Sequence, residues 1–415
     1  MWKIAYNILL HILLPFFLLF SLTKKKIRNN LAERLWPSTK NTDLKGAIWI
    51  HAASIGEAVI AEAVVNYMRN RSGFDNFLIT TNTYYARDML RKKFNDRISV
   101  YSLPFDLTYS LKHFIGTSTF KALLIVETEI WPNLVWQAKK RNIPVIIING
   151  RISDKTYNTY LFFSSFLKTV FSDITLVLAQ SEEHAKRFNA LGMDSTKVIK
   201  TGNIKYYRYL AITSDNIHKE NIVTFGSIKE KEVDIILQVI FMLKKCFSRF
   251  KFFIVPRELN LVDRIENGLA NRFNTMRYSV YKKSSVETAH AVEALVVDTV
   301  GDLPDVYKKS MVAFVGGSLA PYGGQNVLEP LFFGTPVLFG PYIENFRDIA
   351  GTILENEAGI MVNNAEELFE KIRLLIENDR LREKMGERGH SIIEAQKEVM
   401  ERTVNIILET MTDLQ

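Results

Sequence analysis

The alternation of apolar and amphipathic stretches constrains the fold more than any other feature of this 415-residue sequence. Short, nearly continuous apolar runs are separated by stretches with the length and polarity of helices. The runs fall at 47–52, 77–81, 121–128, 144–150, 176–180, 221–226, 250–256, 294–298, 312–317 and 336–340. Apolar strands separated by helices belong to parallel sheets that are covered on both faces. The sequence therefore predicts the α/β class.

The pattern weakens over residues 206–220, a polar segment with no clear period. We place a linker there, and it divides the chain into two βα halves of similar length. Two such halves imply a cleft between them, with ligands near the carboxyl ends of the strands. The tail from about residue 381 has a helical pattern rich in Glu, Lys and Arg.

Composition excludes several classes of protein. Apolar residues make up 47% of the chain and charged residues 24%, so most of the chain can bury a core and is not disordered. The net charge of +8 suits nucleic acid, anionic lipid or an acidic substrate. No RNA- or DNA-binding signature accompanies this charge, so we expect no nucleic-acid partner. Cys246 is the single cysteine, which rules out an intramolecular disulfide and a multi-cysteine metal site.

An uncharged stretch runs from Ile4 to Thr23 near the amino terminus. A helix of this length spans roughly 30 Å, the thickness of a bilayer core. A signal peptide is disfavoured because no small-residue cleavage site follows. We therefore predict that residues 1–23 form a membrane anchor. A single span and an interfacial helix in one leaflet both remain open, since Asn7, His11 and Pro15 weaken a clean span.

Basic residues follow this stretch directly, whereas only Lys3 precedes it. They are Lys24, Lys25, Lys26 and Arg28. An excess of cations marks the cytoplasmic side of a membrane segment. We therefore expect the body of the protein on the cytoplasmic face of a membrane, in contact with its lipids.

The turn after the first predicted strand holds Ser54 and Glu57, within the segment HAASIGE. Ser54 can cap the helix that follows, and a carboxylate at Glu57 complements the positive end of the helix dipole. A carboxylate at this strand end can also act as a general base on an acceptor hydroxyl. Both interpretations stay open on the residues alone.

Polar residues follow further strands of the first half. Glu129 stands in the segment VETEIWPN, where two carboxylates and a tryptophan suit sugar hydroxyls better than a core. Arg151 ends the next strand and supplies a cation for a carboxylate or phosphate. Lys205 is a second cation, close to the linker. Each residue alone is typical of a solvated surface, but together they indicate a binding site.

The second half shows a pattern typical of anion binding. Backbone N–H groups between a strand end and a helix start can hold a phosphate. An acid about one turn inside the helix after a glycine-rich loop, Glu329, can accept both hydroxyls of a ribose. The candidate residues of this half are Ser227, Arg257, Gly301, Gly317, Asn326 and Glu329.

The chain has no Asp-x-Asp motif and no His or Cys cluster at metal spacing. We therefore expect a group transfer that needs no metal. Arg257 and a helix end would stabilise the leaving phosphate in its place.

Several segments, taken in order, resemble the 3-deoxy-D-manno-octulosonic acid (Kdo) transferase family of lipopolysaccharide synthesis. They are HAASIGE, VETEIWPN, NGRIS, AQSEEHAKRF, TGNIKY, the Gly-Ser pair at 226–227, VPR, DTVGDL, FVGGSL, GGQNVLEP and GTPVLFGP. The resemblance extends from the amino-terminal stretch almost to Ile349. Any one segment is common, but the ordered set is specific.

This resemblance implies a GT-B fold, with two Rossmann-like domains facing each other across a cleft. It implies an acceptor-binding domain at 24–210, a CMP-sugar-binding domain at 211–380, and helices at 381–415 of which the last packs back on the first domain. It also implies CMP-Kdo as donor, the tetra-acylated lipid A precursor (lipid IVA) as acceptor, and an inverting mechanism with neither metal nor cofactor. The expected location is the bacterial inner membrane.

The family's site residues carry over by position. Glu57 matches the proposed base. Positions on the acceptor or Kdo side are matched by Ser54, Glu129, Arg151 and Lys205. Positions on the CMP side are matched by Ser227, Arg257, Gly301, Gly317, Asn326 and Glu329.

Four residues depart from the family pattern. Gln325 and Glu258 stand where the family commonly has His, Ile228 replaces a usual Thr, and Tyr207 stands where an Asp often occurs. Gln325 can still donate a hydrogen bond. Tyr207 leaves the geometry next to the linker in question. None of the four removes the proposed base or the ribose contact.

Two other functions fit part of the sequence. Another GT-B glycosyltransferase or a nucleotide-sugar epimerase would share the glycine-rich turn and Glu329, but is not expected to share the residues around Glu57 and Glu129. A non-catalytic, membrane-tethered protein that binds nucleotide or lipid would bind without turnover.

Overall fold

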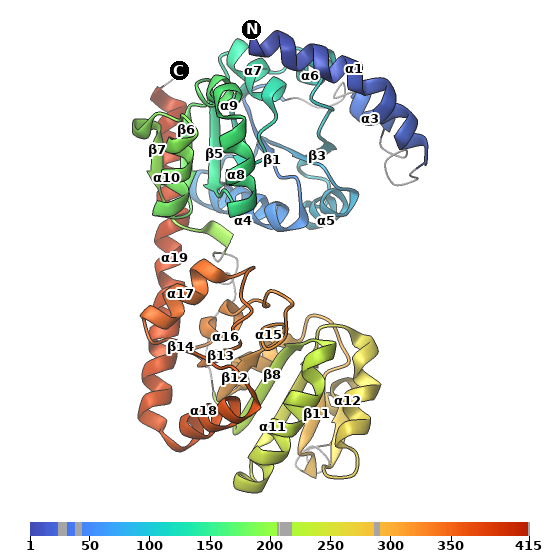
Figure 1. Ribbon diagram of the computed structural model, residues 1–415, viewed down its shortest axis with the longest axis vertical. Helices are drawn as coiled ribbons and strands as arrows, with labels where there is room; N and C mark the ends of the chain where they lie inside the picture. Colours follow the sequence, from blue (N-terminus) through green and yellow to red (C-terminus); the bar gives the residue numbers. More distant parts are fainter. Residues whose placement is uncertain (24–30, 38–43, 206, 208–217, 286–290, 414–415) are drawn as a thin grey trace. The chain divides into compact units, whose positions relative to one another are not determined.

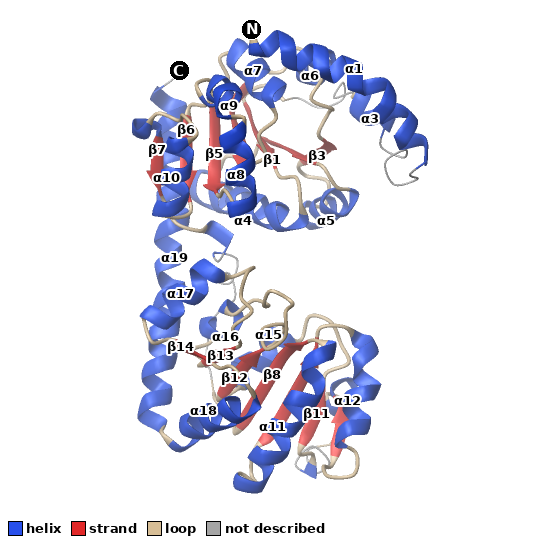
Figure 2. Cartoon of the chain, viewed as in Figure 1, coloured by secondary structure: helices blue, strands red, loops and turns tan. Residues whose placement is uncertain are grey.

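The computed structural model describes residues 1–23, 31–37, 44–205, 207, 218–285 and 291–413. The chain divides into two compact units, one of Met1–Arg208 with Gln396–Gln415 and the other of Tyr209–Ala395. Each unit contains a parallel sheet layered with helices (Figure 1, Figure 2). The α/β class and the two Rossmann-like halves predicted from the sequence are confirmed.

The amino-terminal unit has a sheet of seven parallel strands in the order β3-β2-β1-β4-β5-β6-β7. The strands are β1 (Ala47–His51), β2 (Phe77–Thr81), β3 (Ser99–Ser102), β4 (Phe120–Val126), β5 (Val145–Gly150), β6 (Leu176–Ala179) and β7 (Val198–Lys200). The chain order reverses between β1 and β4. A reversal of this kind is where open α/β sheets bind ligands, beyond the carboxyl ends of the strands.

Helices connect these strands. They are α4 (Ile55–Ser72), α5 (Tyr84–Phe94), α6 (Thr108–Ile115), α7 (Pro132–Lys140), α8 (Asp154–Phe162), α9 (Ser164–Phe171) and α10 (Glu182–Ala190). Both faces of the sheet are buried beneath them. In β1, for example, Ile48 and Ile50 belong to one core cluster, and Trp49 belongs to the cluster on the opposite face. Burial on both faces explains why the central strands are apolar along their whole length.

The second unit also has a seven-stranded parallel sheet, in the order β10-β11-β9-β8-β12-β13-β14, and its order reverses between β8 and β12. The strands are β8 (Ile222–Ile228), β9 (Lys251–Pro256), β10 (Thr275–Arg277), β11 (Ala294–Val296), β12 (Val312–Val315), β13 (Val337–Phe339) and β14 (Gly359–Met361). The main helices are α11 (Val233–Cys246), α12 (Val262–Leu269), α15 (Leu303–Lys309), α16 (Leu328–Phe332), α17 (Arg347–Glu355) and α18 (Ala365–Glu377).

All ten predicted apolar runs contain a strand. The sequence does not predict β3, β7, β10 and β14, and these four lie at the edges of the two sheets. The helical tail is confirmed as α19 (Asp379–Asp413). Met400, Val404 and Ile407, in its last part, belong to a core cluster of the amino-terminal unit.

The first helix, α1 (Trp2–Thr23), is continuous through Pro15 and lies against the amino-terminal unit. Three polar side chains attach it there. The Tyr6 hydroxyl donates to Oδ2 of Asp106 at 2.8 Å, and Nδ2 of Asn7 donates to Oδ1 of Asn133 at 3.0 Å. Lys3 forms an ion pair with Asp173 at 3.0 Å.

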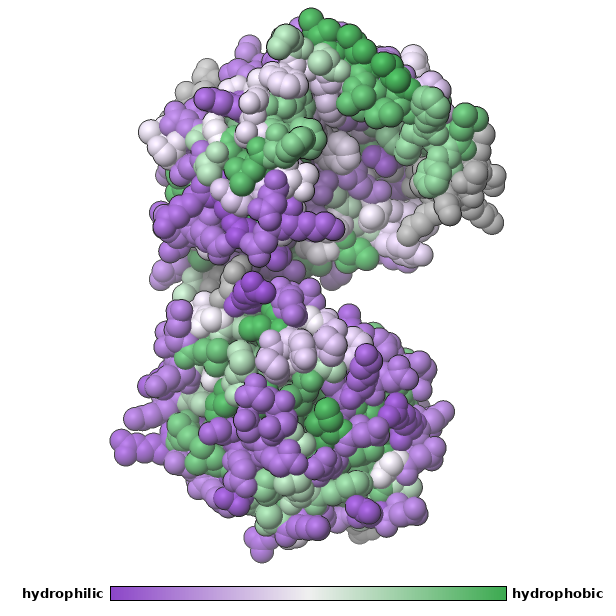
Figure 3. All heavy atoms as spheres, in the orientation of Figure 1, coloured by the Kyte–Doolittle hydropathy of each residue, from purple (hydrophilic) through white to green (hydrophobic). Residues whose placement is uncertain are grey.

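The opposite side of α1 is apolar and exposed, as the hydrophobic band along this helix in Figure 3 shows. Ile4 and Phe16 are each 67% exposed. The other exposed large apolar residues of α1 are Trp2, Ile8, Leu9, Ile12, Leu13, Leu19 and Phe20. By length and composition, α1 is the one helix in the described part of the chain that could cross a membrane. The basic residues Lys24, Lys25, Lys26 and Arg28 lie outside the described residues.

Asp106 connects α1 with the start of α7. Its carboxylate accepts hydrogen bonds from the backbone N–H groups of Asn133 (3.0 Å) and Leu134 (2.9 Å), as well as from Tyr6. Burial raises the pKa of this carboxyl from an ordinary 3.8 to about 6, although all three hydrogen bonds favour the charged form. The desolvation cost therefore outweighs the stabilisation by the helix start.

This balance predicts a pH dependence of stability. Because the folded pKa is raised, the stability that Asp106 contributes is present at low pH and is lost as the pH rises through about 6. Between about pH 4 and about pH 8 the free energy of unfolding should fall by roughly 2–3 kcal/mol more in the wild type than in Asp106→Asn, whose side chain stays neutral. Chemical denaturation in detergent measures both profiles. The hydrogen bonds that Asp106→Asn loses lower its stability at every pH and do not change the slope. Parallel curves of unfolding free energy against pH for the two proteins would therefore contradict the assignment of this pH dependence to Asp106.

Candidate functional site

Glu57 lies three residues into α4, directly beyond the carboxyl end of β1, and is 7% exposed. The Oε2 atom of Glu57 accepts from the backbone N–H of Ala53 at 2.8 Å, and Oε1 accepts from the Ser54 hydroxyl at 2.7 Å. Ser54 in turn accepts from the backbone N–H of Glu57 at 3.3 Å. Ser54 therefore caps α4, as predicted, and the Glu57 carboxylate holds the backbone of the residue before the cap. Each carboxylate oxygen has two lone pairs and keeps one for another donor.

Two further carboxylates follow β4, the strand on the other side of the reversal point. Burial raises the pKa of Glu129, and the Glu57 carboxylate adds to this effect. Burial and Glu57 likewise raise the pKa of Glu127. Glu57 and Glu129, predicted as site residues, are therefore close enough to interact, and Glu127 joins them.

Arg151 and Lys205 belong to the same group of charges. Both of them, together with His184, oppose the rise in the pKa of Glu127. Arg151 follows β5, and its carbonyl accepts a hydrogen bond from the Thr128 hydroxyl, between the two carboxylates. The structure therefore brings the predicted residues Glu57, Glu129, Arg151 and Lys205 to one edge of the sheet.

Sequence reasoning did not select two residues that the structure places here. Glu127 has a φ of 60° and Asn149, at the end of β5, a φ of 54°, and both values lie in the left-handed region that non-glycine residues rarely adopt. Asn149 is fully buried, and its Oδ1 accepts from the backbone N–H of Ile204, the neighbour of Lys205. Strained backbone of this kind gathers at functional sites. No sequence signal announces it, because neither residue is glycine.

In the second unit the turn after β8 is equally constrained. Ser227 is 8% exposed and has a φ of 56°. A Cβ atom at the preceding Gly226 would come within 1.9 Å of the Tyr307 hydroxyl, so only glycine fits there. The backbone N–H of Arg257 donates to the Ile228 carbonyl at 2.8 Å, which brings the predicted Arg257 beside this turn. The Arg257 guanidinium forms no ion pair or side-chain hydrogen bond with the described residues.

The turn after β12 encloses a carboxylate from its own unit. Glu232 is fully buried and accepts four backbone N–H groups, from Lys229 (3.0 Å), Gly317 (2.6 Å), Ser318 (2.9 Å) and Leu319 (2.9 Å). The N–H group of Gly317, predicted to lie at a phosphate, therefore already has an anionic partner. Glu232 joins the turns after β8 and β12 and fixes their geometry without a ligand.

The glycine-rich loop leads to Asn326 and Glu329. The Asn326 Oδ1 atom accepts from the backbone N–H of Leu328 at 3.2 Å, and its Nδ2 atom donates to Glu329 at 3.1 Å. Glu329 is the second residue of α16, nearer the helix start than predicted. Gly317 reaches this loop, because its carbonyl accepts from Gly324 at 2.7 Å. No hydrogen bond between described residues links the turn of Gly301 with Ser227 or Gly317.

The four departures from the family pattern have different surroundings. Ile228 is buried in the core cluster of its sheet, and Glu258 pairs with Lys229. A Cβ atom at Gly317 would lie 3.1 Å from Cγ of Gln325, so Gln325 packs against the glycine turn. Tyr207 makes an edge contact with the ring of Tyr67, with centroids 5.5 Å apart.

The role of Glu232 predicts a large effect on stability. Glu232→Ala leaves four buried N–H groups without their partner and should lower the free energy of unfolding by roughly 3 kcal/mol or more. Glu232→Gln keeps one oxygen and the side-chain volume and should cost less. Chemical denaturation measures both, with Glu230→Ala in the same segment as the control. Equal stability of Glu232→Ala and the control would contradict the role.

A family model described as 3-Deoxy-D-manno-octulosonic-acid transferase (kdotransferase) matches residues 29–208. The 3-deoxy-D-manno-octulosonic acid transferase of Haemophilus influenzae is 30% identical to this chain over 426 residues, which cover 98% of each protein. The enzyme of the same name from Aquifex aeolicus is 30% identical over 345 residues, 83% of this chain and 90% of that protein.

A longer relative comes from Fusobacterium nucleatum, the protein called bifunctional glycosyltransferase/methyltransferase. It is 35% identical over 390 residues, and the match covers 90% of this chain but 59% of that protein.

Solved structures agree on the fold. The UDP-GlcNAc 2-epimerase of Neisseria meningitidis has a TM-score of 0.60 at 17% identity and is matched over 88% of this chain and 100% of its own. MurG of Acinetobacter baumannii has a TM-score of 0.53 at 14% identity, with coverage of 88% and 99%. At these identities the likeness supports the GT-B fold and nothing about substrates.

Proposed function

Because this chain belongs to the family of 3-deoxy-D-manno-octulosonic acid transferases, we propose that it transfers Kdo from CMP-Kdo to the lipid A precursor lipid IVA in lipopolysaccharide synthesis. One observation carries the proposal beyond the family name. Glu57 is fixed at the reversal point of the first sheet and interacts there with Glu127 and Glu129, close to Arg151 and Lys205. Carboxylates and cations side by side suit an acceptor with hydroxyl and phosphate groups.

Glu57 acts as the general base in this mechanism. It takes the proton from a glucosamine hydroxyl of the acceptor, and that oxygen forms a bond to the anomeric carbon of Kdo. The bond from the anomeric carbon to the phosphate oxygen breaks on the opposite face, and its electron pair leaves with CMP. Attack opposite the leaving group inverts the configuration. The hydrogen bonds from Ala53 and Ser54 orient the carboxylate before the acceptor arrives.

The other charged residues compensate the charges of the substrates. Arg151 and Lys205 balance the Kdo carboxylate and the acceptor phosphates, which would otherwise be repelled by three carboxylates in one place. In the second unit Glu329 binds the ribose hydroxyls of CMP. Arg257 and the backbone near Ser227 bind its phosphate and stabilise the negative charge that the departing CMP gains.

The hydrogen bonds of Glu57 at the start of α4 allow a clean test of the base. Glu57→Gln keeps an oxygen that can accept from the Ala53 N–H and an amide that can bond the Ser54 hydroxyl, so the helix start should persist while the basic group is lost. Turnover should fall by about two to four orders of magnitude. Calorimetry should show unchanged CMP binding. Glu62→Gln, the same change further along α4, serves as the control. If Glu57→Gln keeps near wild-type turnover, another group takes the proton.

We further propose that α1 holds the enzyme at the cytoplasmic face of the inner membrane as an interfacial helix. Its polar side chains support this orientation over a span. In a spanning helix Lys3, Tyr6 and Asn7 would leave the body of the protein. Asp106, Asn133 and Asp173 would then lose their side-chain bonds to α1. An interfacial helix keeps these bonds and buries only its apolar side in one leaflet.

The two orientations place the amino terminus on different sides of the membrane. A Trp2→Cys substitution in a Cys246→Ser chain puts a single cysteine at the start of α1. In intact spheroplasts a membrane-impermeant maleimide should leave this cysteine unlabelled, and labelling should appear only after lysis. Val300→Cys, at a position that is 87% exposed, is the cytoplasmic control. Labelling of the Trp2 position before lysis would establish a span instead.

A further inference from the structure

A cavity of about 380 Å³ opens beside the edge strand β3, and none of the residues that line it belongs to the group of charges around Glu57. The short helix α3 (Leu31–Leu35) and the chain after it form one wall, and α5 forms another. The polar side chains that line it belong to Glu33, Arg87, Arg91, Tyr101 and Ser102, and Trp36 contributes an aromatic wall. The proposed transfer uses none of these residues.

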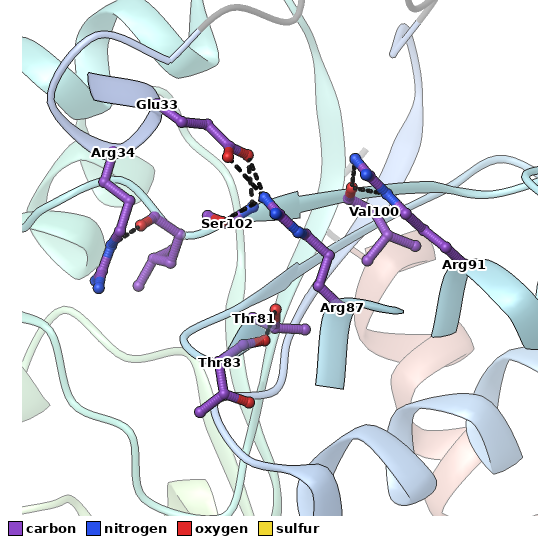
Figure 4. Close-up of polar contacts among 9 residues, drawn as sticks. Glu33, Arg34, Thr81, Thr83, Arg87, Arg91, Val100 and Ser102 are labelled. Atoms are coloured by element: carbon purple, nitrogen blue, oxygen red, sulfur yellow. Dashed lines mark hydrogen bonds and ion pairs between the residues drawn. The ribbon is translucent and has the colours of Figure 1, made fainter. Parts of the chain in front are cut away.

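Arg87 is a fixed cation in this cavity. It is 9% exposed, and its Nη1 atom donates to both carboxylate oxygens of Glu33, at 2.7 and 2.6 Å, and to the Ser102 hydroxyl at 2.9 Å (Figure 4). Every hydrogen bond of Arg87 to a described residue starts from Nη1. No described residue therefore occupies the Nε and Nη2 atoms, which can bind an anion. A guanidinium held in this way has lost its side-chain entropy before a ligand binds.

Arg91 lies one turn further along α5 and is exposed. Its Nε and Nη2 atoms both donate to the Val100 carbonyl, at 3.2 and 2.9 Å (Figure 4). Its Nη1 atom has no hydrogen bond to a described residue. The Glu33 carboxylate balances one of the two guanidinium charges, so the cavity has one positive charge in excess. A ligand with one or two negative charges and several acceptor oxygens matches this arrangement.

The cavity is also connected to α1 through direct contacts. Phe17 of α1 packs against the ring of Phe105 with centroids 5.2 Å apart. The guanidinium carbon of Arg34, in α3, lies 4.4 Å from the centre of the same ring, and the Phe105 N–H donates to the Arg34 carbonyl at 3.0 Å. Trp36, which follows α3, is 66% exposed, and tryptophan is favoured at the level of lipid headgroups.

We propose that this cavity is an anion subsite that takes the phosphate group of a lipid at the membrane surface. Arg91 and the free N–H groups of Arg87 bind the phosphate oxygens, and Trp36 packs against the lipid portion next to the phosphate. Two lipids present this chemistry, a phospholipid of the bilayer and the phosphorylated acceptor. The position at the membrane surface rests on the proposed insertion of α1, whereas the anion chemistry of the cavity does not.

Arg91→Ala in the full-length chain tests the subsite. Lys92→Ala is the matched control, because it removes the same charge from the neighbouring position of α5, and Lys92 pairs with Asp88 instead of lining the cavity. One measurement is flotation with vesicles of phosphatidylcholine, alone or mixed with phosphatidylglycerol. The other is calorimetric titration with the acceptor lipid in the absence of donor, which needs no turnover and stays informative if Glu57 is not the base.

The two measurements distinguish the sources of the phosphate. If a phospholipid binds, Arg91→Ala should weaken flotation with the acidic vesicles about fivefold to tenfold more than Lys92→Ala does, with no change for phosphatidylcholine alone. If the acceptor phosphate binds, the same difference should appear in the titration. Glu33→Gln, which removes the competing carboxylate, should tighten whichever interaction Arg91→Ala weakens. Equal effects of Arg91→Ala and Lys92→Ala in both measurements would overturn the subsite.

Discussion

The common direction of the strands is the constraint on which the rest of the structure depends. Because all strands in each sheet are parallel, every turn that follows a strand lies at the same edge, and the reversals between β1 and β4 and between β8 and β12 open those edges to ligands. The segments around Glu57 and Glu129 flank the first reversal, and those around Ser227 and Gly317 flank the second. Residues far apart in the sequence become neighbours for this reason alone.

The sequence predicted the strands that are buried on both faces and did not predict the strands at the edges of the two sheets. Every central strand has apolar residues on both faces, and each of these strands overlaps a predicted run. The four strands that were not predicted are edge strands. β3, with the sequence SVYS, and β7, with VIK, are short and half exposed, so they lack a continuous apolar run. A partly exposed edge strand does not need a continuous run of apolar residues, so its sequence pattern is weaker.

The candidate site divides in a similar way. Charged residues at strand ends, such as Glu129 and Arg151, could be selected from the sequence, because a charge directly after an apolar strand is conspicuous. The strained backbone at Glu127 and Asn149 could not, since nothing in their residue types requires a positive φ. The hydrogen-bond partners of Glu232 could not be predicted from the sequence either. Its four N–H donors come from two turns separated by more than eighty residues in the sequence, and only the folded sheet brings them together.

The attachment of α1 by hydrogen bonds has a consequence for how the enzyme would meet the proposed lipid acceptor. A hydrophobic segment joined to the protein by a flexible linker would keep the protein at the bilayer. It would not fix the height or the tilt of the protein relative to the membrane. Tyr6 and Asn7 instead fix the helix to Asp106 and Asn133 at the start of α7, so insertion of α1 as proposed would hold the amino-terminal unit at a fixed height above the bilayer. The sugar headgroup of the proposed lipid acceptor would then reach the enzyme at one height above the membrane. Replacing α1 with an unrelated hydrophobic segment would therefore preserve residence at the membrane and lose the alignment.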